Sequence, residues 1–204
     1  LYVELVTTYF VVRALRKLGK KARFIFSWDD YDRFRKVPKN IESSYEQYLG
    51  LPYSDIPDPY GCCESYAKHF QNEFEIAIEK FNIDIEFIYQ NQQYKSGRYN
   101  TLIVHAFSMR KEIYDILMDY KTQNHDMMER ENYYPGVVYC HSCGKDNTKI
   151  HNYDTHAYGI KYSCTCGFSE TMNALEADNI KLSWKIDWPM RWKYENVIFE
   201  PGGR

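Results

Sequence analysis

The hydrophobic pattern of the first ninety residues changes twice from helical to strand spacing. Apolar residues over 2–18 recur at helical spacing and surround almost the whole of the first turns, which predicts a largely buried helix that ends before Gly19. The continuous apolar run 22–28 then predicts a buried strand. An apolar stripe over 64–81 and an alternating stretch over 83–89 repeat this order. Two helix–strand units in succession predict an α/β fold with a parallel sheet.

Three aspartates follow the first predicted strand. In parallel sheets ligands bind at the carboxyl ends of the strands, and Asp29 and Asp30 fall at that point. The alternative is a solvated turn, in which neighbouring cations neutralise the carboxylates: Arg33, Arg35 and Lys36. The pattern alone leaves both interpretations open.

Prolines and polar loops separate the remaining elements of the N-terminal part. The four prolines within 38–59 predict irregular structure with a short helix at 44–49. Residues 91–99 are polar and contain Gly97, which predicts a loop. An apolar face that recurs over 100–120 predicts one long helix.

Residues 136–169 interrupt this pattern and carry the strongest chemical signal. Short strand-like pieces at 137–139 and 159–163 are joined by polar turns. The segment therefore has too little hydrophobic core of its own and needs a cross-link to be stable. Four cysteines supply one, in two close pairs that each precede a glycine: Cys140, Cys143, Cys164 and Cys166. This spacing is typical of a zinc ribbon, whose closed four-thiolate site is structural. The alternative is free or disulfide-bonded cysteines.

A second group of metal-ligand residue types lies between the predicted irregular region and the second helix. Asp58 and Cys62 flank a Pro-Tyr-Gly turn, Cys63 follows, and His69 lies near the start of the helix. Adjacent cysteines seldom both bind one ion, and buried free cysteine is common, so the spacing alone also fits a site without metal.

The C-terminal stretch KLSWKIDWPMRWKYENVIFEPGGR concentrates three tryptophans, a carboxylate and a double glycine. Asp187 suits the N-cap of a short helix with Pro189 in its first turn, and the helix is expected to end near Asn196. Trp188 and Trp192 then share one helix face.

Residues 197–199 after this helix predict a buried strand, and residues 200–203 a tight turn. Indole faces beside a fixed carboxylate suit an ammonium ligand, and a Gly-Gly turn after a strand suits a phosphate or a ribose. The alternative is a tryptophan-rich core helix that leads into an edge strand.

Composition excludes few function classes. The chain has 204 residues, of which 44% are hydrophobic, and a net charge of −2, so the overall balance requires neither nucleic acid nor an acidic membrane. Because no apolar run approaches the roughly 20 residues that span a bilayer and no signal peptide is recognised, we expect a cytoplasmic protein without a membrane partner.

Two long motifs resemble class I lysyl-tRNA synthetases: SWDDYDRFRKVPKN at 27–40, and WKIDWPMRW followed by FEPGGR near the C-terminus. The resemblance implies a Rossmann-type parallel sheet, the nucleotide-binding fold of that class. Residues 1–99 would form its first part and residues 100–180 an inserted connective domain with the zinc ribbon at about 136–169. Residues 181–204 would return to the catalytic domain.

The same resemblance implies an enzyme that activates lysine with ATP and Mg²⁺ to lysyl-adenylate and transfers the lysyl group to tRNA(Lys). Trp184, Asp187 and Trp188 would lie near the lysine, with Asp29 and Asp30 as further candidates.

The resemblance also bears on the double glycine and on metal binding. Gly202 and Gly203 would approach the adenosine. Enzymes of this type carry a DP-x-G-C-H-like ligand set at the second metal position, where this chain has Cys63 in place of the histidine.

Two signature elements of the class, the HIGH-like and KMSKS-like sequences, do not occur in the chain. We therefore expect the 204-residue piece to be inactive when isolated. Three alternatives stay open: a zinc-ribbon module on an α/β scaffold that binds RNA or protein, a class I synthetase for another amino acid, and a purely structural role.

Overall fold

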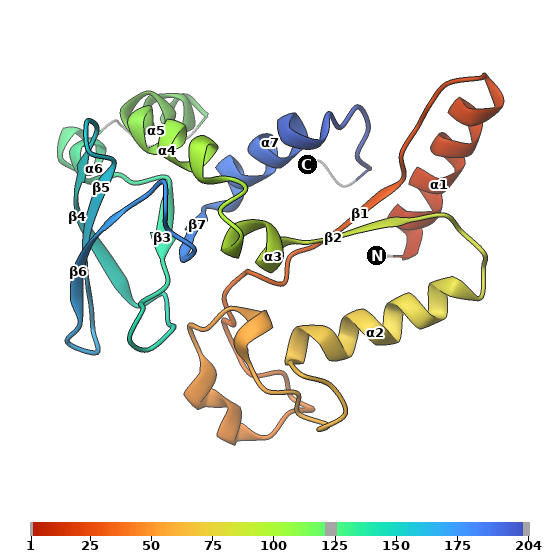
Figure 1. The fold of residues 1–204 in the computed structure, drawn as a ribbon, viewed down its shortest axis with the longest axis horizontal. Coiled ribbons are helices and arrows are strands. Elements are labelled where there is room, and N and C mark those ends of the chain that lie inside the picture. Colours follow the sequence, from red (N-terminus) through yellow and green to blue (C-terminus); the bar gives the residue numbers. More distant parts are fainter. Residues whose placement is uncertain (1, 121–125, 202–204) are drawn as a thin grey trace.

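The computed structural model describes residues 2–120 and 126–201 (Figure 1). The N-terminal part contains α1 (Tyr2–Lys17), β1 (Ile25–Trp28), α2 (Tyr66–Glu79) and β2 (Glu86–Tyr89). The two strands pair in parallel, with Ile25 opposite Glu86 and Trp28 opposite Tyr89. The predicted α/β architecture with a parallel sheet is therefore confirmed.

Helices α1 and α2 pack on this strand pair through a small core of Leu5, Val12, Phe24, Phe74 and Ile78. The prediction that α1 is largely buried was wrong: the side chains of Val3 and Phe10 are 79% and 59% exposed. Only one stripe of the helix meets the core, because the two-stranded sheet and α2 cover a single side of it.

The segment between β1 and α2 is irregular, as expected, with two short 3₁₀ helices, η1 (Ser43–Tyr48) and η2 (Tyr53–Asp55). After β2 the predicted polar loop is in fact a helix, α3 (Gln90–Lys95). Its first turn is fixed from outside, because Asp30 Oδ1 accepts the N–H of Asn91 at 2.7 Å.

The predicted long helix is divided into α4 (Asn100–Ser108) and α5 (Arg110–Asp119), and α6 (Met127–Asn132) follows. Met109 leaves the helical region, with φ −96° and ψ 19°. The bend lets α5 bury Tyr114 and Met118 while α4 buries Ile103 and Phe107.

The C-terminal part contains two antiparallel sheets. β3 (Gly136–Val138) pairs with β7 (Ile180–Leu182). β4 (Thr148–Asp154), β5 (Gly159–Cys164) and β6 (Ser169–Asn173) form a three-stranded sheet in that order, with an irregularity at His151. The predicted pieces at 137–139 and 159–163 correspond to β3 and β5. Sequence pattern missed β4 and β6 because polar residues occupy most of their exposed face.

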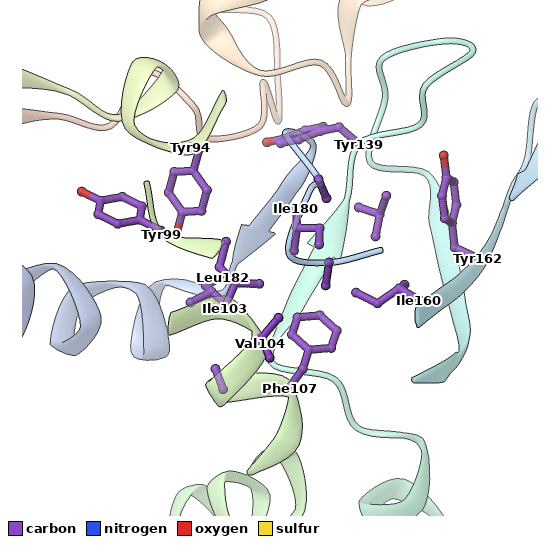
Figure 2. Close-up of a cluster of buried hydrophobic side chains, with 14 of the residues drawn as sticks. Tyr94, Tyr99, Ile103, Val104, Phe107, Tyr139, Ile160, Tyr162, Ile180 and Leu182 are labelled. Atoms are coloured by element: carbon purple, nitrogen blue, oxygen red, sulfur yellow. The ribbon is translucent and has the colours of Figure 1, made fainter. Parts of the chain in front are cut away.

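One large core joins the C-terminal sheets to α3 and α4 (Figure 2). Tyr94 and Tyr99 approach it from α3 and the turn after it, and Ile103 and Phe107 from α4. Its other labelled members are Val104 of α4 and five residues from the strands and position 139: Tyr139, Ile160, Tyr162, Ile180 and Leu182. This core crosses the boundaries predicted at residues 99 and 180, and the division into domains stays a prediction.

The last helix, α7 (Trp184–Glu195), begins earlier than expected. Ser183 is its N-cap, and the N–H of Asp187 already donates to Ser183 O at 2.8 Å, so the N-cap assignment of Asp187 was wrong. Pro189 lies inside the helix rather than in its first turn. The predicted end is confirmed by Asn196, which adopts the left-handed conformation with φ 53°.

Residues 197–199 do not form the predicted buried strand: they lack strand structure, and Ile198 is 85% exposed. No strand of the described chain pairs with them, so their apolar side chains have no sheet to enter. Gly202 and Gly203 lie outside the described residues. No helix of the described residues is long and apolar enough to cross a membrane.

Candidate functional site

A cleft of about 1010 Å³ lies between α1, β1 and α7, and the segment after α7 contributes to its wall. Asp29 and Gln90, which directly follow β1 and β2, line it together with Trp188 of α7. The carboxyl ends of the two parallel strands thus open into the cleft, which is where ligands bind in sheets of this kind.

Arg191 is the central charged group of this region. The residue is 9% exposed; its Nη1 donates to Asp29 Oδ1 at 2.7 Å and to Ser27 Oγ at 3.1 Å. Its Nη2 lies 2.9 Å from Asp187 Oδ2. Burial lowers the pKa of Arg191, but the charges of Asp187 and Asp29 outweigh it and raise the pKa, so the guanidinium stays charged.

Asp187 is buried, with 1% of its surface exposed. Its Oδ2 accepts from Lys181 Nζ at 2.7 Å and forms an ion pair with Arg191, and its Oδ1 accepts from the hydroxyl of Tyr94. Burial and the Asp187 charge raise the pKa of Tyr94 well above its usual value, so the phenol remains a donor. The carboxylate is therefore saturated by the protein, and its predicted contact with lysine stays a prediction.

Asp30 is also an interior group. Its Oδ2 accepts from Gln71 Nε2 at 3.0 Å, its Oδ1 from the backbone of Asn91, and only 5% of its surface is exposed. Burial raises the pKa of Asp30. Asp29, by contrast, has a side chain that is 46% exposed and belongs to the cleft wall. Of the two neighbouring candidates, only Asp29 lines the cleft.

The three tryptophans of α7 form a row, with ring centroids 6.0 Å apart in both the Trp184–Trp188 and the Trp188–Trp192 pairs. This confirms that Trp188 and Trp192 share one face. Both line the cleft, whereas Trp184 is 55% exposed and lies outside the cleft lining.

Sequence reasoning missed several residues that the structure brings to the cleft: Glu4, Gln90, Arg191 and Glu200. Burial and the charges of Asp29 and Glu4 raise the pKa of Glu200, while Arg191 opposes them. The spacing of Asp187 and Arg191, four residues apart on a helix, was the one available signal for the arginine. Glu4 and Gln90 come from distant parts of the chain, and Glu200 belongs to the turn predicted after α7.

The four cysteines of the C-terminal part converge as predicted. Their sulfurs all lie within 4.8 Å of one another, with 3.7 Å between Cys140 and Cys166 and between Cys143 and Cys164. Burial raises the pKa of Cys143 to about 12, and the N–H of Phe168 lowers the pKa of Cys166 to about 7. Four sulfurs this close together fit a tetrahedral divalent metal such as zinc.

The second predicted group also converges, with ligand atoms of Asp58, Cys62, Cys63 and His69 within 4.8 Å of one another. Cys62 Sγ lies 3.1 Å from His69 Nδ1, and Asp58 Oδ1 lies 3.3 Å from the same nitrogen. Burial raises the pKa of Asp58, but N–H donors from Tyr60, Cys62 and Cys63 outweigh it and lower the pKa to about 2. The carboxylate is therefore ionised and able to bind a cation.

The family described as "tRNA synthetases class I (K)" matches residues 2–204. The chain belongs to this family. A parallel strand pair flanked by helices, with a cleft at its carboxyl end, fits the α/β fold of class I tRNA synthetases.

Curated relatives of this class I family carry the name lysine–tRNA ligase. The chain is 42% identical to the protein of Pyrococcus horikoshii over 201 residues. It is 40% identical to that of Treponema pallidum and 43% to that of Borreliella burgdorferi, each over 203 residues. These matches cover 98% of the chain and 38% of each relative, so the chain spans well under half the length of these ligases.

Proposed function

We propose that the full-length protein is a class I lysine–tRNA ligase and that this chain forms part of its catalytic domain. The observation that carries the proposal is the 40–43% identity to lysine–tRNA ligases over 98% of the chain. Such an enzyme joins the lysine carboxylate to the α-phosphate of ATP and releases pyrophosphate. The lysyl group then passes to the 3′-terminal ribose of tRNA(Lys), and AMP leaves.

Residues 1–99 would supply the first part of the Rossmann-type domain, with β1 and β2 as two of its strands. Residues 100–180 would form the connective insertion, and residues 181–204 would return to the catalytic domain. Gly202 and Gly203 keep their proposed place beside the adenosine.

The lysine ammonium is assigned to the cleft, with Asp29 as its carboxylate and Trp188 as an aromatic wall. Asp29 is the candidate that combines cleft exposure with a position at a strand end. Arg191 holds this carboxylate in one orientation. Asp30 and Asp187, whose oxygens already accept hydrogen bonds from the protein, support the site from the interior. Trp184 extends the aromatic row beyond the cleft.

Catalysis by such a site consists of alignment and charge stabilisation rather than covalent chemistry by the protein. The cleft would fix the lysine carboxylate opposite the α-phosphate of ATP·Mg²⁺. The HIGH-like and KMSKS-like sequences, which stabilise the phosphates in this class, are absent from these 204 residues. The isolated piece is therefore expected to bind but not to activate lysine.

Zinc is assigned to the four cysteines as a structural ion in a zinc ribbon, and a second zinc to Asp58, Cys62, Cys63 and His69. Cys140, Cys143, Cys164 and Cys166 would all bind as thiolates and leave no open position, so this ion takes no part in the reaction. The protein would work in the cytoplasm, together with its tRNA substrate.

Lysine-dependent ATP–pyrophosphate exchange by the full-length protein tests the proposal. We expect exchange that requires lysine, a strongly raised KM for lysine in Asp29→Asn, and a smaller rise in Arg191→Lys, because one ammonium cannot replace both nitrogens of the guanidinium. Trp184→Ala should have a smaller effect than Trp188→Ala.

Each unexpected outcome has a distinct meaning. Exchange with a different amino acid would keep the family and reject lysine as the substrate. Exchange with no amino acid would reject the enzyme and favour a zinc-ribbon module that binds RNA or protein. An unchanged KM in Asp29→Asn would move the ammonium site elsewhere in the cleft.

A further inference from the structure

The first cysteine knuckle, defined here as residues 139–147, is clasped to the segment that follows β1, residues 29–51. Tyr139, directly before Cys140, donates its hydroxyl to Tyr31 O at 2.9 Å. The two rings also meet edge to face with centroids 5.1 Å apart. Tyr31 is two residues from Asp29, which lines the cleft.

Residues at the other end of the knuckle contact the same segment farther along the chain. Asp146 donates its N–H to Gly50 O at 2.9 Å, and its Oδ2 lies 3.1 Å from Arg33 Nε. The Asp146 side chain is only 5% exposed. Lys145 Nζ donates to Gln47 O at 2.7 Å. A carboxylate is thus buried at the junction between the knuckle and the segment 29–51.

The junction is close-packed at two glycines. A Cβ on Gly144 would lie 2.8 Å from Leu51 Cδ2, and a Cβ on Gly50 would lie 3.1 Å from Asp146 Oδ1. Both glycines have positive φ, 73° and 91°. Side chains of the opposite segment pack directly against these two glycines because neither glycine has a Cβ.

The knuckle owes its shape to the cysteine cluster. Cys140 accepts the N–H of Gly144 at 2.7 Å and donates its own N–H to Lys145 O at 2.9 Å, a tight turn around the two sulfurs. A metal that binds these sulfurs would hold the turn, and with it Tyr139, Lys145 and Asp146, in one conformation. Without metal the segment 29–51 would lose its rigid partner, since it has only two short 3₁₀ helices within or beside it.

We propose that the first cysteine knuckle positions the segment 29–51, with Asp146 as its main positioning residue, so that metal at the four cysteines controls how well the cleft binds lysine. The inference rests on the proposed function for the identity of the ligand. The mechanical coupling of knuckle and segment does not depend on it.

Amide hydrogen exchange of the full-length protein tests the coupling directly. The reporters are the N–H groups of Phe34 and Gly50, which donate to Leu51 O and Phe34 O within the segment. Removing metal with a chelator should accelerate their exchange by about tenfold or more, the effect of losing one hydrogen bond to a charged group. Unchanged exchange after measured loss of metal would overturn the proposal.

Two variants test the contact between the knuckle and the segment 29–51 separately from metal binding. Asp146→Ala and, from the other side, Arg33→Gln should keep the full metal content, accelerate the same amides and raise the KM for lysine more than they lower kcat. Lys149→Ala, an exposed change on β4 just after the knuckle, is the matched control and should alter none of these. A chelator should add little to the exchange rates of Asp146→Ala.

The outcomes also separate this inference from the proposed function. If amide hydrogen exchange is accelerated as expected but the protein shows no lysine-dependent ATP–pyrophosphate exchange, the coupling of knuckle and segment stands and the enzyme assignment is rejected. The opposite result is also informative. If the protein is active with lysine, but Asp146→Ala has the same kinetics and the same amide exchange as the unaltered protein, the enzyme assignment stands and the coupling of knuckle and segment is rejected.

Discussion

Arg191 joins Asp187 to Asp29: one guanidinium nitrogen lies 2.9 Å from the buried carboxylate and the other 2.7 Å from the carboxylate in the cleft. Lys181 continues the series from Asp187 at 2.7 Å to Asp32 at 3.2 Å. Two carboxylates of the loop after β1 are therefore held by a row of alternating charges whose central members are buried. Through these ion pairs, α7 holds in place the loop after β1, which forms part of the cleft wall.

Loss of the central carboxylate should destabilise this region strongly. Asp187→Asn leaves the buried cations Lys181 and Arg191 without their shared anion, and breaking such a pair costs about 3–5 kcal/mol. The exposed pair of Asp84 and Arg16 is the control, because Asp84 has an 85% exposed side chain and Asp84→Asn should cost less than about 1 kcal/mol. Amide exchange of α7 in the full-length protein measures the difference; equal protection in both variants would contradict the assignment.

Metal analysis should find two ions per chain, each tied to its own cluster. Cys166→Ser is expected to remove the ion at the four cysteines, and His69→Ala the ion at Asp58, so each variant retains one equivalent. His156→Ala, which changes a histidine outside both clusters, should retain two. Elemental analysis of the purified full-length protein gives the count. One equivalent in the unaltered protein that only Cys166→Ser removes would reject the second site.

The Asp58 turn should lose stability in acid. The carboxylate has a pKa of about 2 in the fold, below its ordinary value of 3.8, because N–H donors from Tyr60, Cys62 and Cys63 favour the charged form over the effect of burial. A lowered pKa means that the stabilisation is complete above pH 3.8 and disappears as the pH falls through about 2.

The comparison that tests this uses Asp58→Asn. With exchange rates corrected for the intrinsic effect of pH, the amides of Cys62 and Cys63 should be better protected in the unaltered protein near pH 5, and the two proteins should converge toward pH 2. A constant difference across this range would show that the ionisation of Asp58 does not stabilise the turn.

A methyl group on Gly136 should disrupt the pairing of β3 with β7. Its Cβ would lie 2.6 Å from the backbone oxygen of Lys181, and backbone cannot yield as a side chain can. Gly159→Ala on β5 is the control, since there the nearest atom is 3.7 Å away. We expect Gly136→Ala to expose the amides of β7 and to lower the thermal midpoint, and Gly159→Ala to change neither. A tolerated Gly136→Ala would contradict this close approach.

Local features of the candidate site could be predicted from the sequence because they depend on short-range geometry. Each cysteine pair lies on its own tight turn beside a glycine of positive φ, Gly144 at 73° and Gly167 at 94°. The sulfurs of a pair therefore fall on one side whatever the rest of the fold does. The helix–strand units and the end of α7 at Asn196 were predictable for the same reason.

Long-range features could not be predicted. Asp187 has a carboxylate that looks available on a helix, and its saturation depends on Tyr94, 93 residues away, as well as on Lys181 and Arg191. The apolar triplet 197–199 reads as a strand, but a strand needs a neighbour, and the described chain offers none.

Hydrophobic spacing and cysteine spacing are properties of adjacent residues, and from them the chain alone specified its α/β class and its four-sulfur cluster. Which carboxylate faces the cleft was settled by folding. Asp29 and Asp30 are neighbours of the same type at the end of the same strand, yet one side chain is 46% exposed beside Arg191 and the other is buried against α2 and α3. Both residues lie in the turn after β1, where local pattern does not fix side-chain direction, so only packing against α2 and α3 decides which carboxylate is covered.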